Sequence, residues 1–71
     1  MTWEKNVYSS MVSSVGYDRE TKELYVTWVR GKRSIYGPGV PEELATDLAN
    51  AASVGSMVNA EIKPYFQHRY G

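Results

Sequence analysis

Residues 23–29 read ELYVTWV, which is the clearest strand pattern in the chain. Its side chains alternate with a period of two, and nearly every member is β-branched or aromatic, which is typical of a strand with both faces partly covered. The tight turn Arg30-Gly31-Lys32 follows, in which Gly31 can take a positive φ. Residues 33–36 (RSIY) then return as a short strand, so the pair predicts an antiparallel hairpin.

The residues before this hairpin predict one more strand. Residues 8–17 (YSSMVSSVGY) mix hydroxyl side chains with apolar ones, which indicates a strand with a polar face. Residues 18–22 (DRETK) form a charged turn of the kind that joins antiparallel strands.

The residues after the hairpin predict two helices. Gly37-Pro38-Gly39 ends the third strand, and Pro41 followed by two acids begins a helix that runs to about Ala52. Gly55 is expected as the left-handed residue that ends this helix. Ser56 is expected as the N-cap of a second helix that extends through residue 63 before a proline stops it.

These elements make an α+β fold in the order β-β-β-α-α. We predict a three-stranded antiparallel sheet covered on one face by two helices, in a single domain over residues 1–71. Trp28, in the middle of a strand and flanked by apolar residues, is assigned to the core. The tail of residues 65–71 is expected to fray by default, although His68 and Arg69 can close over a ligand or contact a neighbouring subunit.

Composition restricts the classes of function. The chain has 71 residues, no cysteine, one histidine and equal numbers of acidic and basic side chains. It therefore offers no zinc ligand set and no nucleophile motif, so we expect neither an enzyme nor a metal or cofactor. It also lacks the overall positive charge of a general nucleic-acid binder. A core this small often needs further support, so we expect a homo-oligomer. No apolar run is long enough to span a membrane and no signal peptide is evident, so we expect a cytoplasmic protein.

The spacing of particular residues resembles the KTSC domain family. The resemblance rests on Ser9-Ser10, Gly16-Tyr17-Asp18, residues 24–28, and above all residues 52–65 (ASVGSMVNAEIKPY). That family is named for the C-terminus of some lysyl-tRNA synthetases and also occurs as stand-alone proteins of bacteria and their phages. The resemblance implies no enzymatic activity, and RNA binding is a suggested role. The family's Tyr-x-Tyr on the third strand is matched here by Ser34-Ile35-Tyr36, so only the second tyrosine is retained.

Three groups of residues are candidates for ligand contact. Cations in the hairpin turn can converge on a phosphate or equally can protect a sheet edge. Hydroxyl and amide side chains near the second helix can seat an anion, although capping explains them as well. Tyrosines can stack on a base, although packing is their commoner use. The predicted ligand-binding residues are Arg30, Lys32, Arg33, Tyr36, Ser53, Asn59 and Tyr65.

Two functions follow as hypotheses. The first is a non-enzymatic module that binds or sequesters a nucleotide-type, phosphate-bearing ligand, either a small nucleotide signal or a short RNA; a stand-alone phage member could act by sequestration alone. The second is a protein-interaction module or an inhibitor of a host protein, which the tyrosine-rich, charge-neutral composition also favours.

Overall fold

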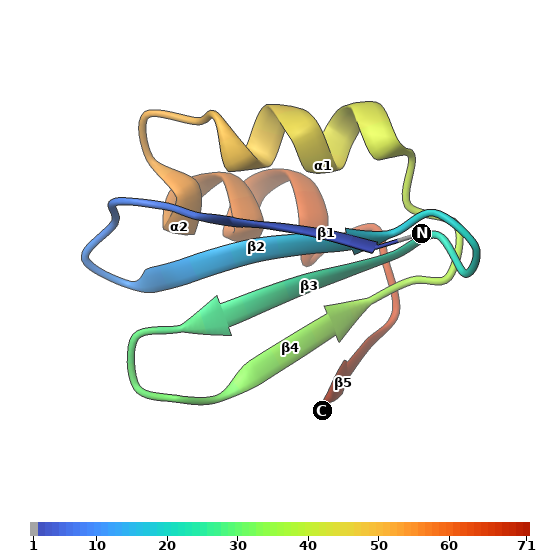
Figure 1. Ribbon diagram of the computed structural model, residues 1–71, viewed down its shortest axis with the longest axis horizontal. Helices are drawn as coiled ribbons and strands as arrows, with labels where there is room; N and C mark the ends of the chain where they lie inside the picture. The colour runs from blue at the N-terminus through green and yellow to red at the C-terminus, as the bar shows by residue number, and fades with distance from the viewer. Residues whose placement is uncertain (1) are drawn as a thin grey trace.

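The computed structural model describes residues 2–71 and shows one antiparallel sheet with helices on one face (Figure 1). The sheet has five strands in the order β1-β2-β3-β4-β5, and every neighbouring pair is antiparallel. In chain order the elements are β1 (Thr2–Asn6), β2 (Val12–Asp18), β3 (Glu23–Trp28), β4 (Arg33–Tyr36), α1 (Glu42–Ala49), α2 (Val54–Met57), a π-helical continuation η1 (Val58–Ile62), and β5 (His68–Tyr70). The α+β class and the three central strands are confirmed.

The prediction of three strands is wrong, because the sheet gains one strand at each edge. β1 pairs with β2, and its Trp3 ring lies 6.1 Å from that of Tyr17. The indole Nε1 of Trp3 also donates to Oε2 of Glu42 at 3.0 Å, which ties the edge strand to the start of α1. β5 pairs with β4, so the tail that was expected to fray is instead an ordered strand.

Element boundaries also differ from the predictions. The first predicted strand begins at Val12 rather than at residue 8, and α1 ends at Ala49, before residue 52. The second helix starts after Ser53 rather than after Ser56. Gly55 does not end the first helix: it is buried inside α2, where an added Cβ would lie 3.2 Å from Sδ of Met11. This glycine therefore permits close packing of α2 on the loop before β2.

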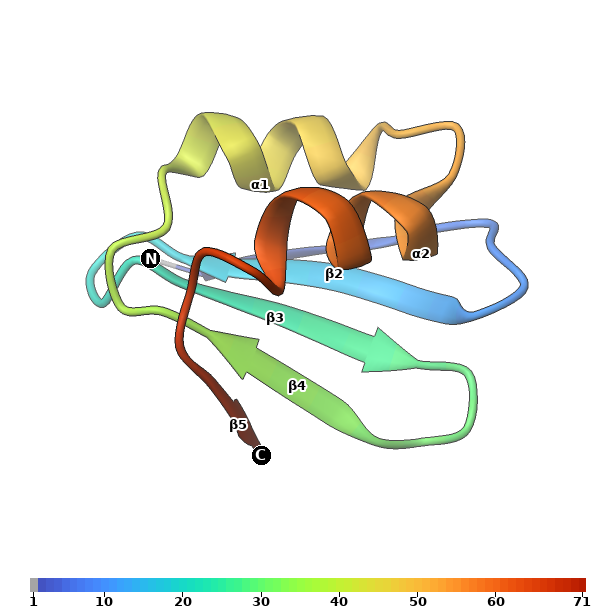
Figure 2. The same cartoon turned by 180° about the vertical axis from the view of Figure 1, so that it is seen from behind.

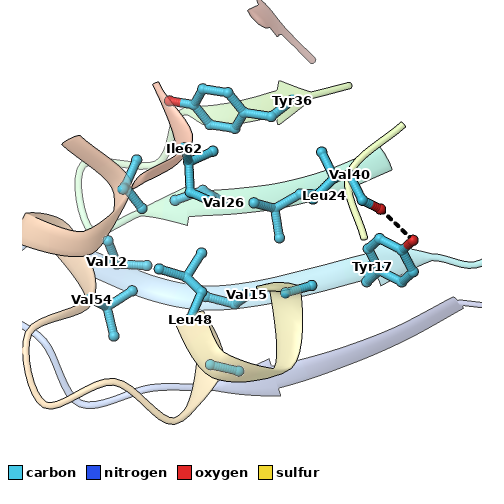
Figure 3. Packing of buried hydrophobic residues seen from close by; sticks show 13 residues of the cluster. Val12, Val15, Tyr17, Leu24, Val26, Tyr36, Val40, Leu48, Val54 and Ile62 are labelled. Atoms are coloured by element: carbon cyan, nitrogen blue, oxygen red, sulfur yellow. Dashed lines mark hydrogen bonds between the residues drawn. The ribbon is translucent and has the colours of Figure 1, made fainter. Parts of the chain in front are cut away.

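The core lies between the helices and the central strands (Figure 3). A register shift between Val12 and Ser14 lets both Val12 and Val15 face the helices despite their odd spacing. The phenol of Tyr17 donates to the carbonyl oxygen of Val40 at 2.6 Å, which satisfies a buried polar group at the entry to α1. The fully buried aliphatic residues are Val12, Val15, Leu24, Val26, Val40, Ala45, Leu48, Val58 and Ile62.

The helices do not cover the whole sheet. α1 contacts β2, and both views place β5 at the far side of the sheet from α1 (Figures 1 and 2). The part of this face that lies beyond the helices is where the candidate site forms. Across residues 2–71, no helix is both long and apolar enough to cross a bilayer.

Candidate functional site

A groove of about 560 Å³ lies where β3, the hairpin turn, β4 and β5 meet. This volume falls within the range of roughly 300–1,000 Å³ that is usual for small-molecule sites. The strands supply most of its floor and one wall, and the loop before β2 supplies its other end. Its lining consists of Ser10, Met11, Trp28, Val29, Arg30, Lys32, Ser34, His68 and Tyr70.

The sheet register explains why these residues meet. Ser34 on β4 lies directly opposite Val26 on β3 and Tyr70 on β5. Because Val26 faces the helices, Ser34 and Tyr70 must share that face, since side chains across a ladder point the same way. His68 lies opposite Tyr36 and joins the same face. The groove is therefore the uncovered continuation of the face that carries the core.

A hydrogen bond fixes the floor of the groove. Nε1 of Trp28 donates to Oγ of Ser34 at 2.7 Å, and Ser34 is only 2% exposed. A half-buried indole N–H needs such a partner. This bond holds the Trp28 ring beside the groove.

Aromatic rings form the wall that β5 contributes. The His68 ring stacks on Tyr36 with centroids 5.0 Å apart and planes at 24°. It also meets the Tyr70 ring edge to face at 4.6 Å and 78°. Aromatic pairs in these geometries stabilise the fold by more than the burial of their surface alone. Tyr70 itself remains 70% exposed, so most of its ring is free for contact.

The position of β5 is secured by polar contacts around it. The amide of Gly37 donates to the carbonyl of Gln67, and the amide of Gly71 donates to that of Arg33. On the opposite face of the sheet, Nη1 of Arg69 donates to Oε2 of Glu23 at 2.8 Å. The hydrogen bond from Arg69 is the main reason that the pKa of the Glu23 carboxyl lies below its ordinary value.

Two of the three predicted cations reach the groove. Gly31 takes a φ of 98° in the turn, as predicted, and Arg30 and Lys32 on either side of it line the groove. Nζ of Lys32 lies 5.8 Å from the Tyr70 ring centroid, close enough for a cation–π contact. Among the described residues that line the groove there is no Asp or Glu, so the local charge favours an anion.

The comparisons with known proteins agree with this architecture. The model of the KTSC domain matches residues 8–66, which is most of the chain. The chain belongs to the KTSC domain family. The crystal structure of a KTSC domain protein from Yersinia pestis is similar at 30% sequence identity, with a TM-score of 0.83, over 97% of this chain and 96% of that one. No curated protein matches the chain.

In this KTSC domain, Arg33 does not join the other two cations. It lies on the opposite face of the sheet, with its guanidinium carbon 5.8 Å from the Tyr25 ring centroid. Nη2 of Arg33 is 4.0 Å from Oε2 of Glu4, which also accepts from the Ser14 hydroxyl. The expectation that three cations converge is corrected because neighbouring residues of a strand point to opposite faces.

Tyr36 is also placed differently from the expectation that it stacks on a ligand. It is 2% exposed and belongs to the core, and His68 covers its ring. Burial raises the pKa of its phenol, an effect partly offset by a hydrogen bond with Ser34. Tyr36 therefore supports the wall of the groove from behind rather than offering a free ring.

The remaining predicted residues lie outside the groove. Ser53 precedes α2, where its hydroxyl donates to that of Ser56 at 2.9 Å. Asn59 is exposed on η1, and Tyr65 is 71% exposed in the turn after it. The structure thus brings Arg30 and Lys32 together but does not add these three to them.

Seven of the nine residues that line the groove were not predicted as ligand contacts, and four of these form its floor and wall. Trp28 was assigned to the core alone, and Ser34 was noted only as a departure from the family pattern. His68 and Tyr70 belong to the tail that was expected to fray by default, with closure over a ligand as an alternative for His68. The spacing of His68 and Tyr70 by two residues was the available signal, because it places both rings on one face of any strand. Across residues 2–71 no group of three His, Cys, Asp or Glu side chains is placed to hold a metal ion.

Proposed function

We propose that this KTSC domain binds a nucleotide-type ligand in the groove without catalysing a reaction. The observation that carries the proposal is the meeting of two cations with three aromatic rings in a groove whose described lining has no acid. A phosphate-bearing ligand with a flat ring uses both halves of this arrangement.

The cations would hold the phosphate. Arg30 and Lys32 flank Gly31 at the turn, so they reach the groove from one end. Contacts between such side chains and phosphate oxygens are charge-assisted hydrogen bonds, about twice as strong as neutral ones. The net charge of the whole chain is zero, so any attraction to a polyanion is confined to this end of the molecule.

The rings would hold the base. Trp28 is fixed by its bond to Ser34, and Tyr70 stands exposed on β5 across the groove. Stacking a base on an aromatic side chain contributes roughly 1–3 kcal/mol in single-strand binders. A free mononucleotide and one nucleotide of a short RNA both offer a phosphate and a base to this groove. To sequester a host nucleotide signal, the domain would only have to bind it here.

The groove is suited to binding rather than catalysis. Among its described lining residues, His68 is the one side chain of ordinary general-base type, and it is packed between Tyr36 and Tyr70. No carboxylate of that lining is available to orient its ring, which a catalytic histidine ordinarily requires. This supports a non-enzymatic role.

Calorimetric titration with mononucleotides and with a short oligoribonucleotide tests the proposal. We expect binding that the double variant Arg30→Ala, Lys32→Ala weakens by roughly a hundredfold or more, since each of the two charge-assisted contacts is worth about 1.5–3 kcal/mol. Lys63→Ala is the matched control, because Lys63 is exposed at the end of η1 and away from the groove. Binding to neither kind of ligand, or equal loss in the control, would contradict the proposal.

Native mass spectrometry of the purified protein adds the stoichiometry. We propose that the domain forms a homo-oligomer, as its small core favours. Oligomers that release nucleotide on denaturation support both proposals, and monomers without ligand oppose both.

A second candidate function is protein interaction. Tyr8 is fully exposed, and Met11 and Val29 are more than half exposed at the same end of the sheet, where the Val29 amide donates to the Met11 carbonyl. Exposed apolar side chains that gather in this way are common at protein interfaces. A stoichiometric host protein that stays bound after nuclease treatment and in high salt, and is lost with Tyr8→Ser, would favour this function.

A further inference from the structure

Ser34 lines the groove from β4. It lies on β4 between Val26 of β3 and Tyr70 of β5, at the bottom of the groove with 2% of its surface exposed. Side chains directly opposite each other across a ladder have Cβ atoms about 4.5–5.5 Å apart. A large side chain at position 34 would therefore fill the space beside Tyr70.

The rings around Ser34 are held in place by other contacts. Nε1 of Trp28 is bonded to the Ser34 hydroxyl on one side. On the other side, His68 is stacked on the buried Tyr36 and packs edge to face on Tyr70. The Ser34 side chain is short, so it leaves space between these rings. A flat ligand can therefore use this space while the rings stay where they are.

We infer that Ser34 is a specificity-determining residue that admits a flat aromatic ring to the groove and thereby selects nucleotides over ligands that carry phosphate alone. This inference rests on the proposed function. The two cations lie at the turn, so a phosphate can reach them without passing Ser34, whereas a ring that stacks between Trp28 and Tyr70 must lie over it.

Substitutions of graded size test the inference. Ser34→Ala keeps the space but removes the hydroxyl that accepts from Trp28, so nucleotide affinity should fall by about threefold, less than in the larger variants. Ser34→Val should weaken it by an intermediate factor. Ser34→Tyr should weaken it by roughly tenfold to a hundredfold, the range expected for the loss of one stacked base. The affinity for pyrophosphate should be the same in all four proteins.

Ser13→Tyr is the matched control for Ser34→Tyr, because it makes the same chemical change at an exposed position of β2 outside the groove. It should leave nucleotide affinity unchanged. Circular dichroism and thermal unfolding of each variant show whether it is folded. If Ser34→Tyr does not fold, Ser34→Val decides, because valine favours strand structure and still narrows the groove.

The outcomes separate this inference from the proposal beneath it. If the unchanged protein binds pyrophosphate and nucleotides equally and Ser34→Tyr binds both as well, the inference is wrong while the groove still binds phosphate. If the unchanged protein binds no nucleotide, the proposed function fails and takes the inference with it. Selective loss of nucleotide binding in Ser34→Tyr, with pyrophosphate binding kept, supports both.

Discussion

One face of the sheet carries two regions of different character. Beneath the helices, the side chains of β2 and β3 are mostly aliphatic, as with Val12, Val15 and Val26, and all three are fully buried. Beyond the helices, β5 and the hairpin turn present Tyr70 and Lys32 instead. The covered region is a packed core, and the open region combines rings with charge.

The contrast shows how one surface serves two purposes. Aliphatic side chains gain most when they are removed from water, so they lie where α1 and α2 provide a cover. Aromatic rings with polar edges are stable at a boundary where one side is packed and the other is wet. Tyr36 and His68 mark that boundary, because the first is buried and the second covers it. Stability and binding should therefore respond separately to substitutions in the two regions.

The sharpest test of this separation is a cavity in the covered region. Leu48 on α1 is completely buried, and Leu48→Ala should lower the free energy of unfolding by about 2–5 kcal/mol. Leu44→Ala is the matched control on the same helix, because Leu44 is only partly buried and should cost less. Urea unfolding measures both. Equal and small losses would show that α1 does not cover the core as described.

A smaller loss is expected at the edge of the core. Tyr17→Phe removes the hydroxyl that donates to the Val40 carbonyl and leaves that carbonyl without this partner. We expect a loss of about 1–3 kcal/mol, the usual cost of an unsatisfied buried polar group. Tyr25→Phe makes the same change on the opposite face of the sheet and should stay within about 0.5 kcal/mol of the unchanged protein. Denaturant unfolding that fails to separate the two would contradict the buried bond.

Much of the covered region could be predicted from the sequence. The alternation in residues 23–29 and the Pro41 start of α1 are strong local signals, because each encodes its own periodicity or cap. The hairpin turn was signalled equally clearly, because Gly31 can take the positive φ that the turn requires. These elements carry the core, so the fold class followed from them.

The open region could not be predicted in the same way. β1 has one large apolar side chain, Trp3, and β5 has three residues, so neither shows a period long enough to recognise. β5 becomes a strand through pairing with β4 and through Arg69 bonding Glu23, which are contacts between distant parts of the chain. Since the groove depends on β5, its wall was missed together with the strand.

The smallest effect is expected where β5 is attached. The pKa of Glu23 is lowered in the folded protein by Arg69, so this pair stabilises the fold above the ordinary carboxyl pKa. That contribution is lost as the pH falls through the lowered pKa, when the carboxylate is protonated. Because the Arg69 side chain is 56% exposed, solvent screens the pair and its contribution to stability is small.

Hydrogen exchange measures this effect locally. Glu23→Gln should lower the protection factor of the Gly71 amide, which bonds the Arg33 carbonyl, and should remove the acid dependence of that protection factor. The protection factor divides out the intrinsic pH dependence of amide exchange. Glu61→Gln, at an exposed position of η1, is the control and should leave both unchanged. A protection factor that still falls in acid in Glu23→Gln would show that another group attaches β5.

The most direct test of the central claim is a two-dimensional ¹H–¹⁵N NMR titration of the protein with a mononucleotide. If the ligand binds in the groove, the indole N–H of Trp28 and the amides of Lys32, Ser34 and Tyr70 should shift together and saturate at one ligand per chain. Shifts confined to Ser53, Asn59 and Tyr65, or no shifts at all, would contradict it.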